Sequence, residues 1–272
     1  MTINGTDDRT NYRLAVVGGG NMGAALIGGL IAGGWSAADL AVVEVADARR
    51  DVLTTMFPGV AVSATVPPCD AALIAVKPYD AADAASAAAA AGARRVLSIA
   101  AGVSIGTLQQ ACGDGVAVVR SIPNTPALLG KGAAAMCAGP FATDEDLDWA
   151  DGILGTVGTV ARVPETLLDA VTGLVGSGPA YLFLVAEALI DAGVLAGLTR
   201  PTADAMVRQL FVGSAAMLAE YGDPVALRAM VTSPGGTTAA GLRVLEEHGT
   251  RSALLEAVFA ATTRSQELGK PH

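Results

Sequence analysis

Short apolar runs alternate with helical segments along the first part of the chain. The apolar runs predict strands at 13–17, 40–45, 71–76, 96–100, 116–121 and 133–137. The third run is apolar throughout, which is typical of a strand covered on both faces of a parallel sheet. Helices are predicted at 22–32, 47–56 and 81–91, the last being rich in alanine, the best helix former. This alternation predicts a mostly parallel sheet with right-handed crossovers.

After about Val163 the strand-like runs end and helix-bounding residues take over. Proline near a predicted helix start and glycine beyond a helix end mark the boundaries. The helices expected here run from Ser177 to about Asp191, from Thr199 to Gly222, from Asp223, and over 237–247 and 252–268. The sequence therefore predicts an α/β domain at 11–163 and an all-helical domain at 164–272.

The predicted helices of the second domain are apolar around much of their circumference, as in Tyr181-Leu182-Phe183-Leu184-Val185. A helix that is apolar on most faces must be buried on most faces. A handful of helices cannot cover one another completely, so we expect a partner subunit of the same chain to complete the cover.

The uncharged stretch Leu14–Ala38 raises the question of a membrane span. It is interrupted by glycine pairs and triplets, so a strand, a turn and a buried helix explain it better than a spanning helix. The N-terminus has neither the basic segment nor the cleavage site of a signal peptide. We expect a cytoplasmic protein without membrane contact.

Charge and cysteine content exclude several classes of protein. The formal net charge is -9, from 17 basic and 26 acidic residues, and no basic patch for nucleic acid is visible. Cys69, Cys112 and Cys137 fit neither a disulfide framework nor a zinc pattern, and two histidines are too few for a histidine metal site. No metal is expected. Lysine occurs only at 77, 131 and 270, so an anionic ligand must be held mainly by arginine, hydroxyls and backbone N–H groups.

The first predicted strand leads into the motif Gly18-Gly19-Gly20-Asn21-Met22-Gly23, and a predicted helix follows. In such a motif the first glycine permits a tight turn, the second lets backbone approach a pyrophosphate, and the third allows close packing of helix on strand. The helix N-terminus then directs N–H groups at the anion. A dinucleotide site is the favoured interpretation, with a purely structural turn as the alternative.

The residues after the second strand give conflicting signals about the dinucleotide. Glu44 lies 21 residues after Gly23, where an acid binds the ribose hydroxyls of NAD. Arg49 and Arg50 follow and are able to pair with the 2′-phosphate of NADP, or to lie on a solvated helix face. NADPH and NADH therefore both remain candidates.

Further candidates follow the third and fourth predicted strands, because the carboxyl ends of parallel strands border the cofactor crevice. Ala75-Val76-Lys77-Pro78 follows the third, and Lys77 is either a phosphate or ribose ligand or simply exposed. After the next strand, the small side chains from Ala100 onward leave room for a nicotinamide.

The segment Ser233-Pro234-Gly235-Gly236-Thr237-Thr238 precedes a predicted helix. Its glycines expose backbone N–H groups, its hydroxyls add donors, and the helix dipole adds partial positive charge. Together they are suited to a small anion such as a carboxylate. An ordinary helix start with threonine caps is the alternative.

Taken together, these segments resemble the pyrroline-5-carboxylate reductase family over nearly the whole stretch from Arg13 to Leu268. The resemblance rests on GGGNMG at 18–23, AVKP at 75–78, SIAAGV at 98–103, RSIPNTPAL at 120–128, GSGPAY at 176–181 and SPGGTTAAGLRVLE at 233–246. The chain departs from the family at Ile122, where methionine is usual, and at Glu44, since many members prefer NADPH.

The resemblance implies reduction of 1-pyrroline-5-carboxylate to L-proline with NADPH or NADH, the last step of proline biosynthesis. It also implies a Rossmann-type domain, a helical dimerisation domain, a homodimer and, in some members, a decamer. The substrate carboxylate is implied to lie in the loop of Ser233, Gly235, Gly236, Thr237 and Thr238, with the Thr238 hydroxyl near the ring nitrogen.

Three alternatives compete with this interpretation. A 3-hydroxyacid dehydrogenase would need a catalytic lysine in the second domain, and no lysine occurs between Lys131 and Lys270. A reductase of another cyclic imine would differ only in the lining of its pocket. A non-catalytic dinucleotide sensor would keep the fold, because fold alone does not establish activity.

Overall fold

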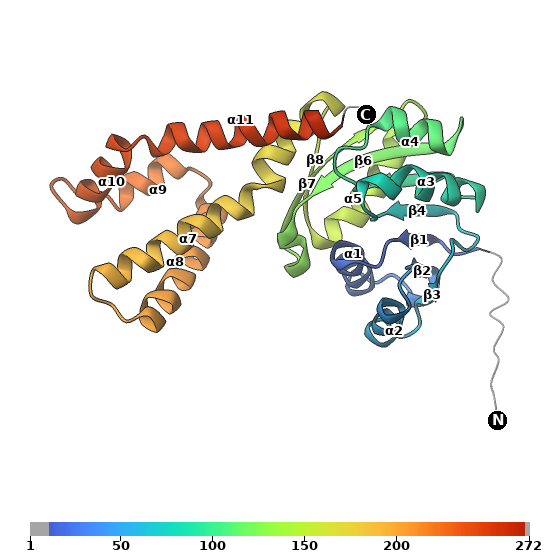
Figure 1. The fold of residues 1–272 in the computed structure, drawn as a ribbon, viewed down its shortest axis with the longest axis horizontal. Coiled ribbons are helices and arrows are strands. Elements are labelled where there is room, and N and C mark those ends of the chain that lie inside the picture. Colours follow the sequence, from blue (N-terminus) through green and yellow to red (C-terminus); the bar gives the residue numbers. More distant parts are fainter. Residues whose placement is uncertain (1–10, 270–272) are drawn as a thin grey trace. The chain divides into compact units, whose positions relative to one another are not determined.

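Eight strands form one sheet in the order β3-β2-β1-β4-β5-β6-β7-β8 in the computed structural model, which describes residues 11–269 (Figure 1). All neighbouring strands are parallel except β6 and β7, which are antiparallel. The strands are β1 (Leu14–Val17), β2 (Leu40–Val43), β3 (Ala61–Ser63), β4 (Ala71–Ile74), β5 (Arg95–Ser98), β6 (Ala117–Pro123), β7 (Gly132–Ala138) and β8 (Gly158–Arg162). The predicted mostly parallel sheet is confirmed, and its first six strands have the order typical of dinucleotide-binding folds. Strands β3 and β8 have no counterpart among the predicted strands.

Helices cover both faces of the sheet, because alternate residues of each strand point to opposite sides. Leu14 and Val16 of β1 belong to one apolar cluster, while Ala15 and Val17 belong to the other. The helices of this unit are α1 (Asn21–Ala32), α2 (Asp47–Met56), α3 (Ala81–Ala90), α4 (Ile105–Cys112), α5 (Asp144–Leu154) and α6 (Leu168–Val171). Helices α4, α5 and α6 were not predicted.

Short turns of helix connect these elements. They are η1 (Ala37–Asp39), η2 (Pro78–Asp80), η3 (Thr125–Leu129), η4 (Gly155–Val157) and η5 (Glu165–Leu167), followed by the π-helical η6 (Thr172–Gly176). The alanine-rich α3 packs through Ala81, Ala85 and Ala88, which lie on one face and are fully buried. Alanine at these positions brings the helix close to the sheet without leaving a gap.

Five helices follow η6 in the described chain, and the predicted all-helical region is confirmed. They are α7 (Gly178–Leu195), α8 (Arg200–Tyr221), α9 (Pro224–Met230), α10 (Thr237–Glu247) and α11 (Thr250–Leu268). The predicted end of α7 near Asp191 is wrong. Gly193 lies inside the helix, where an added Cβ would be 3.2 Å from Ala203 Cβ, so it serves close packing against α8. The chain turns only at Gly197, which has a φ of 105°.

The chain divides into two compact units by its internal contacts. One holds residues 11–176 and 261–269 of the described chain, and the other holds 177–260. The predicted domain boundary at 163/164 lies before this division because Leu168 of α6 is buried in an apolar cluster with residues of β6, β7 and α4. The assignment of functions to 11–163 and 164–272 stays a prediction.

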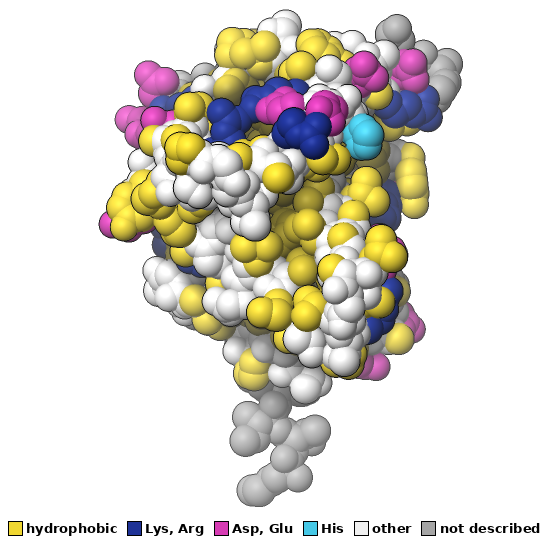
Figure 2. All heavy atoms as spheres, turned by 90° about the vertical axis from the view of Figure 1, so that its left-hand side faces the viewer, with side chains coloured by type: hydrophobic (Ala, Val, Ile, Leu, Met, Phe, Trp, Pro, Cys, Tyr) yellow, Lys and Arg dark blue, Asp and Glu magenta, His cyan; other side chains and the backbone are white. Residues whose placement is uncertain are grey.

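The second unit leaves many large apolar side chains exposed in the single chain. Helix α7 has no buried residue, and α8 buries only Ala203 and Val207. Figure 2 shows apolar side chains spread over the face that it presents. The helical stretch Glu165–Leu195 is long and apolar enough to cross a membrane. A helix that packs against a partner subunit has the same apolar composition, so this stretch is weak evidence for a membrane span.

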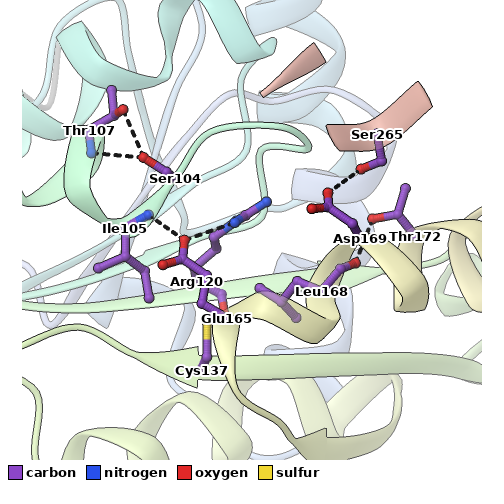
Figure 3. Close-up of polar contacts among 10 residues, drawn as sticks. All are labelled: Ser104, Ile105, Thr107, Arg120, Cys137, Glu165, Leu168, Asp169, Thr172 and Ser265. Atoms are coloured by element: carbon purple, nitrogen blue, oxygen red, sulfur yellow. Dashed lines mark hydrogen bonds and ion pairs between the residues drawn. The ribbon is translucent and has the colours of Figure 1, made fainter. Parts of the chain in front are cut away.

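A polar cluster attaches the end of α11 to the unit that contains the sheet (Figure 3). The buried Arg120 of β6 donates from Nη1 to Glu165 Oε1 at 2.9 Å, and the same oxygen accepts the Ile105 N–H at 2.7 Å. Asp169 Oδ1 accepts the Ser265 hydroxyl at 2.6 Å. The first two contacts join β6 and α4 to η5, and the third joins α6 to α11.

Candidate functional site

The turn between β1 and α1 is built from glycines with different structural roles. Gly18 has a φ of 108°, and a Cβ on it would lie 2.5 Å from the Ala75 carbonyl oxygen. A Cβ on Gly23 would lie 2.1 Å from the Gly18 carbonyl oxygen. Gly20, which precedes α1, has nothing within 4 Å of its Cβ position. Gly18 and Gly23 are glycine because a Cβ at either position would clash with neighbouring backbone. Gly20 has no such neighbour, and it leaves an open approach to the N-terminus of α1.

A cavity of about 940 Å³ opens at this turn, within the size range of ligand sites. It lies at the carboxyl ends of β1, β2 and β4, where this fold binds dinucleotides. Its lining residues are Val17, Gly18, Gly20, Asn21, Met22, Val43, Glu44, Val45, Ala64, Thr65, Val66, Ala75, Val76, Lys77, Asp80, Asp83, Ala84, Ala87, Ile99 and Pro123. The glycine cradle and the cavity fit a dinucleotide.

Most of the predicted cofactor residues are brought together here, namely Gly18, Gly20, Asn21, Met22, Glu44, Ala75, Val76 and Lys77. Four predicted residues do not line the cavity. Gly23 packs behind the turn, Pro78 begins η2, and Ala100 is buried after β5. Arg49 instead lines a second cavity, of about 520 Å³, beside α1.

The lining residues that follow β3 and those on α3 were not among the predicted site residues. Residues 64–66 reach the cavity because β3 pairs with β2 at the edge of the sheet. A strand of only three residues carries too little periodicity to be recognised. Asp83, Ala84 and Ala87 reach the cavity from α3, a helix that was predicted, and their spacing of three and four residues could have identified the face.

Glu44 is held in place by two backbone N–H groups. Its Oε2 accepts from Gly19 N at 3.2 Å, and its Oε1 accepts from Ala46 N at 3.0 Å. The side chain is half-buried and lines the cavity. These bonds fix a carboxylate beside the glycine turn.

The two arginines that follow are held by backbone carbonyl groups and do not themselves line this cavity. Arg49 Nε donates to the Gly19 carbonyl at 2.7 Å. Arg50 Nη1 donates to the carbonyls of Glu44 and Val45 at 2.8 and 2.9 Å, and its Nη2 pairs with Asp47. Glu44 and Arg49 thus bind the N–H and the C=O of the same glycine and stabilise the turn.

The helical unit contains the loop before α10. Gly236 N donates to the Ser233 carbonyl at 3.0 Å, with proline and a glycine of φ 69° at the two central positions of the turn. This is the residue pattern of a type II turn. A Cβ on Gly236 would lie 2.4 Å from Ser233 Oγ, so glycine lets the hydroxyl fold over the turn.

This loop exposes donors that the described residues 11–269 leave unpaired. The hydroxyls of Ser233, Thr237 and Thr238 have no hydrogen bond there, and no side chain caps α10. Ser233 and Thr237 are exposed, and Thr238 is half-buried. Unpaired hydroxyls and N–H groups at a helix N-terminus form a site suited to a small anion.

Other kinds of chemistry have no support in the described part of the chain. No group of three or more His, Cys, Asp or Glu side chains lies close enough there to hold a metal ion. Burial raises the pKa of each of the three cysteine thiols to about 11. The thiolate is the nucleophilic form, so these cysteines are inert at neutral pH.

Two family models match separate parts of the chain. A model of the NADP oxidoreductase, coenzyme F420-dependent, family matches residues 13–102. A model of pyrroline-5-carboxylate reductase dimerisation matches residues 165–268. The first match contains the glycine turn, and the second contains all the helices of the helical unit.

Similar proteins match nearly the whole chain. The pyrroline-5-carboxylate reductase of Synechocystis is 44% identical over 269 residues, which cover 96% of this chain and 99% of that protein. The solved pyrroline-5-carboxylate reductase of Coxiella burnetii has a TM-score of 0.89 and 32% identity, covering 97% and 100% of the two chains. The Plasmodium falciparum pyrroline carboxylate reductase structure, with NADP bound, has a TM-score of 0.81 and 29% identity, covering 96% and 99%.

Proposed function

The chain belongs to the pyrroline-5-carboxylate reductase family, and we propose that it reduces 1-pyrroline-5-carboxylate to L-proline with NADPH or NADH. It is an NAD(P)H-dependent oxidoreductase that acts on a C=N bond. The observation that carries the proposal is the near-complete coverage of curated reductases at 44% identity. The glycine cradle and its cavity support it independently.

The N-terminal unit is suited to hold the cofactor by its diphosphate. The N–H groups at the start of α1 are free to bind an anion, and Gly20 leaves the approach to them open. Glu44 and Lys77 add one charge of each sign at the cavity. When bound, the reduced nicotinamide supplies the hydride.

The loop before α10 is suited to hold the substrate carboxylate. Ser233, Gly235, Gly236 and Thr237 offer hydroxyls and backbone N–H groups, so the anion needs no lysine. The Thr238 hydroxyl orients the ring nitrogen and is the candidate proton donor. A protonated imine is already electrophilic, so positioning supplies most of the rate and a strong acid is unnecessary.

Domain roles and assembly complete the proposal. Residues 11–163 bind the cofactor, and residues 164–272 bind the substrate and form the dimer. The match to a dimerisation model and the exposed apolar helices support self-association. The enzyme works in the cytoplasm as a homodimer or as a decamer assembled from such dimers, without contact with nucleic acid or membrane.

The decisive experiment mixes the protein with 1-pyrroline-5-carboxylate and NADH or NADPH and follows the absorbance of the reduced cofactor. Thr238→Ala should lower kcat by about tenfold or more while the Kd of the cofactor stays within about twofold, since one oriented hydroxyl is lost. The matched control is Thr232→Ala, whose hydroxyl donates to the Arg228 carbonyl at 2.6 Å, away from the unpaired donors. No loss of absorbance with either cofactor would indicate a dinucleotide sensor or a reductase of another imine. An unchanged kcat would remove Thr238 from the mechanism.

A further inference from the structure

The charged residues after β2 separate into two groups in the structure. Glu44 lines the cavity at the glycine turn, whereas Arg49 lines the second cavity beside α1 and Arg50 lines neither. The sequence alone places all three within seven positions of one another, so it cannot distinguish them. The structure therefore decides which sign of charge the cofactor cavity presents there.

Each of these side chains is fixed by hydrogen bonds, so the arrangement does not depend on freely moving groups. The two backbone bonds to Glu44 hold its carboxylate at the cavity. Arg49 is tied to the Gly19 carbonyl, and Arg50 is tied to two carbonyls and to Asp47. Turning either arginine toward the cavity would break these bonds.

We propose that Glu44 makes this enzyme select the coenzyme without a 2′-phosphate, NADH, over NADPH. The inference deepens the proposed function and rests on it. An acid at the end of the second strand accepts hydrogen bonds from ribose hydroxyls in this fold, and it repels a phosphate at the same position. The cofactor named for the matched oxidoreductase family and bound in the Plasmodium structure is NADP, whereas this proposal assigns NADH to this chain.

The remaining charges of the cavity favour the same selection. Asp80 and Asp83 line it together with Glu44, and Lys77 is its only lysine or arginine among the described lining residues. Lys77 follows β4, on the other side of β1 from β2, so it is not a neighbour of Glu44 at the edge of the sheet. A second phosphate group would meet three carboxylates and one ammonium group.

The test measures binding, so it does not depend on the reaction. NADH and NADPH are titrated against the wild-type protein by nicotinamide fluorescence, and AMP and adenosine 2′,5′-bisphosphate are used as competitors. The Kd of NADH should be at least about tenfold lower than that of NADPH, because like charges at close range oppose each other. AMP should likewise bind more tightly than adenosine 2′,5′-bisphosphate.

Glu44→Gln keeps the length of the side chain and one acceptor but removes the charge. In this variant the Kd values of NADH and NADPH should lie within about threefold of each other. The matched control is Asp51→Asn, which removes a carboxylate of α2 outside the lining of this cavity and should leave the ratio of the NADH and NADPH dissociation constants unchanged. Tighter wild-type binding of NADPH would overturn the proposal, even if E44Q does not fold. An equal change of the ratio in both variants would overturn the assignment to Glu44. Selective NADH binding without reduction of the imine would refute the proposed function and leave this inference standing.

Discussion

A substitution at Gly20 distinguishes the role of the glycine turn in folding from its role in cofactor binding. Nothing lies within 4 Å of the position of its Cβ, and its φ of -67° and ψ of -170° are open to alanine. Gly20→Ala should therefore fold normally. The added methyl group stands in front of α1, where the backbone N–H groups are available to an anion.

The size of the effect follows from the bonds at stake. A hydrogen bond to a charged group is worth about 1.5–3 kcal/mol, so losing one bond to the diphosphate should weaken cofactor binding by about 10- to 150-fold. The cost to stability is small, because two effects of alanine nearly cancel. Alanine is a poorer N-cap residue than glycine, which lowers the free energy of unfolding, and it stiffens the unfolded chain, which raises it; each effect amounts to about 1 kcal/mol. The midpoint of thermal unfolding should move by less than about 4 °C.

Two other glycines of the same helix serve as controls. Gly23→Ala should lower both stability and binding, since its Cβ would lie 2.1 Å from the Gly18 carbonyl and overpacking costs about 1–3 kcal/mol. Gly28→Ala should weaken neither cofactor binding nor folding, because the added Cβ would lie 3.7 Å from its nearest neighbour, Phe57 Cε1. It should raise stability by up to about 1 kcal/mol through helix propensity.

Cofactor titration and thermal unfolding of the three variants decide the matter. Full cofactor affinity in G20A would show that the dinucleotide does not approach the N-terminus of α1, and the assignment of the cavity would fail. A large loss of stability in G20A with normal binding would show that the space beside Gly20 is not open.

Three further predictions concern acid stability, thiol reactivity and assembly. Burial acts to raise the pKa of Asp146, but hydrogen bonds from Thr143 and Arg95 outweigh it and hold the pKa below its usual value. That stabilisation is present above about pH 4 and is lost as pH falls through the folded pKa, so the unfolding free energy of Asp146→Asn should depend less on pH below about 4; identical acid profiles would contradict this. The cysteine thiols, with pKa values near 11, should resist alkylation at pH 8 until the protein unfolds, and rapid labelling of the native protein would disprove their inertness. Phe183 is 69% exposed in the single chain, and Phe183→Asp should shift light-scattering mass toward the monomer without loss of the sheet unit; an unchanged mass would place Phe183 outside the interface.

The parts of the fold that the sequence predicted are those with strong local signals. Strands β1 and β4 are continuous apolar runs, and the structure pairs them inside the sheet, between β2 and β5. Strand β8 was missed because its residues are half-buried or exposed at the sheet edge, so its sequence lacks an apolar run. Helix α5 begins with a capping box of Thr143 and Asp146, a signal that was available in the sequence.

The candidate site shows a different limit. Residue types and spacing were enough to find the glycine turn, the strand ends and the loop before α10. They could not tell Glu44 from Arg49, because the direction of each side chain depends on the Gly19 peptide group that both of them bind. Neither could they show that the loop hydroxyls are unpaired, since pairing depends on the turn that Gly235 and Gly236 allow.

The difference in burial between the two units leads back to the assembly. Strands β1, β2 and β4 are buried at every position, so the sheet unit obtains its core from its own helices. Helix α8 is longer than any of those strands and buries only two residues. Apolar helices exposed to this extent would associate in water, because burial of apolar surface is the dominant favourable term in association. Unlike the sheet unit, the helical unit therefore depends on a second copy of the chain for much of its core, and its stability should rise with protein concentration.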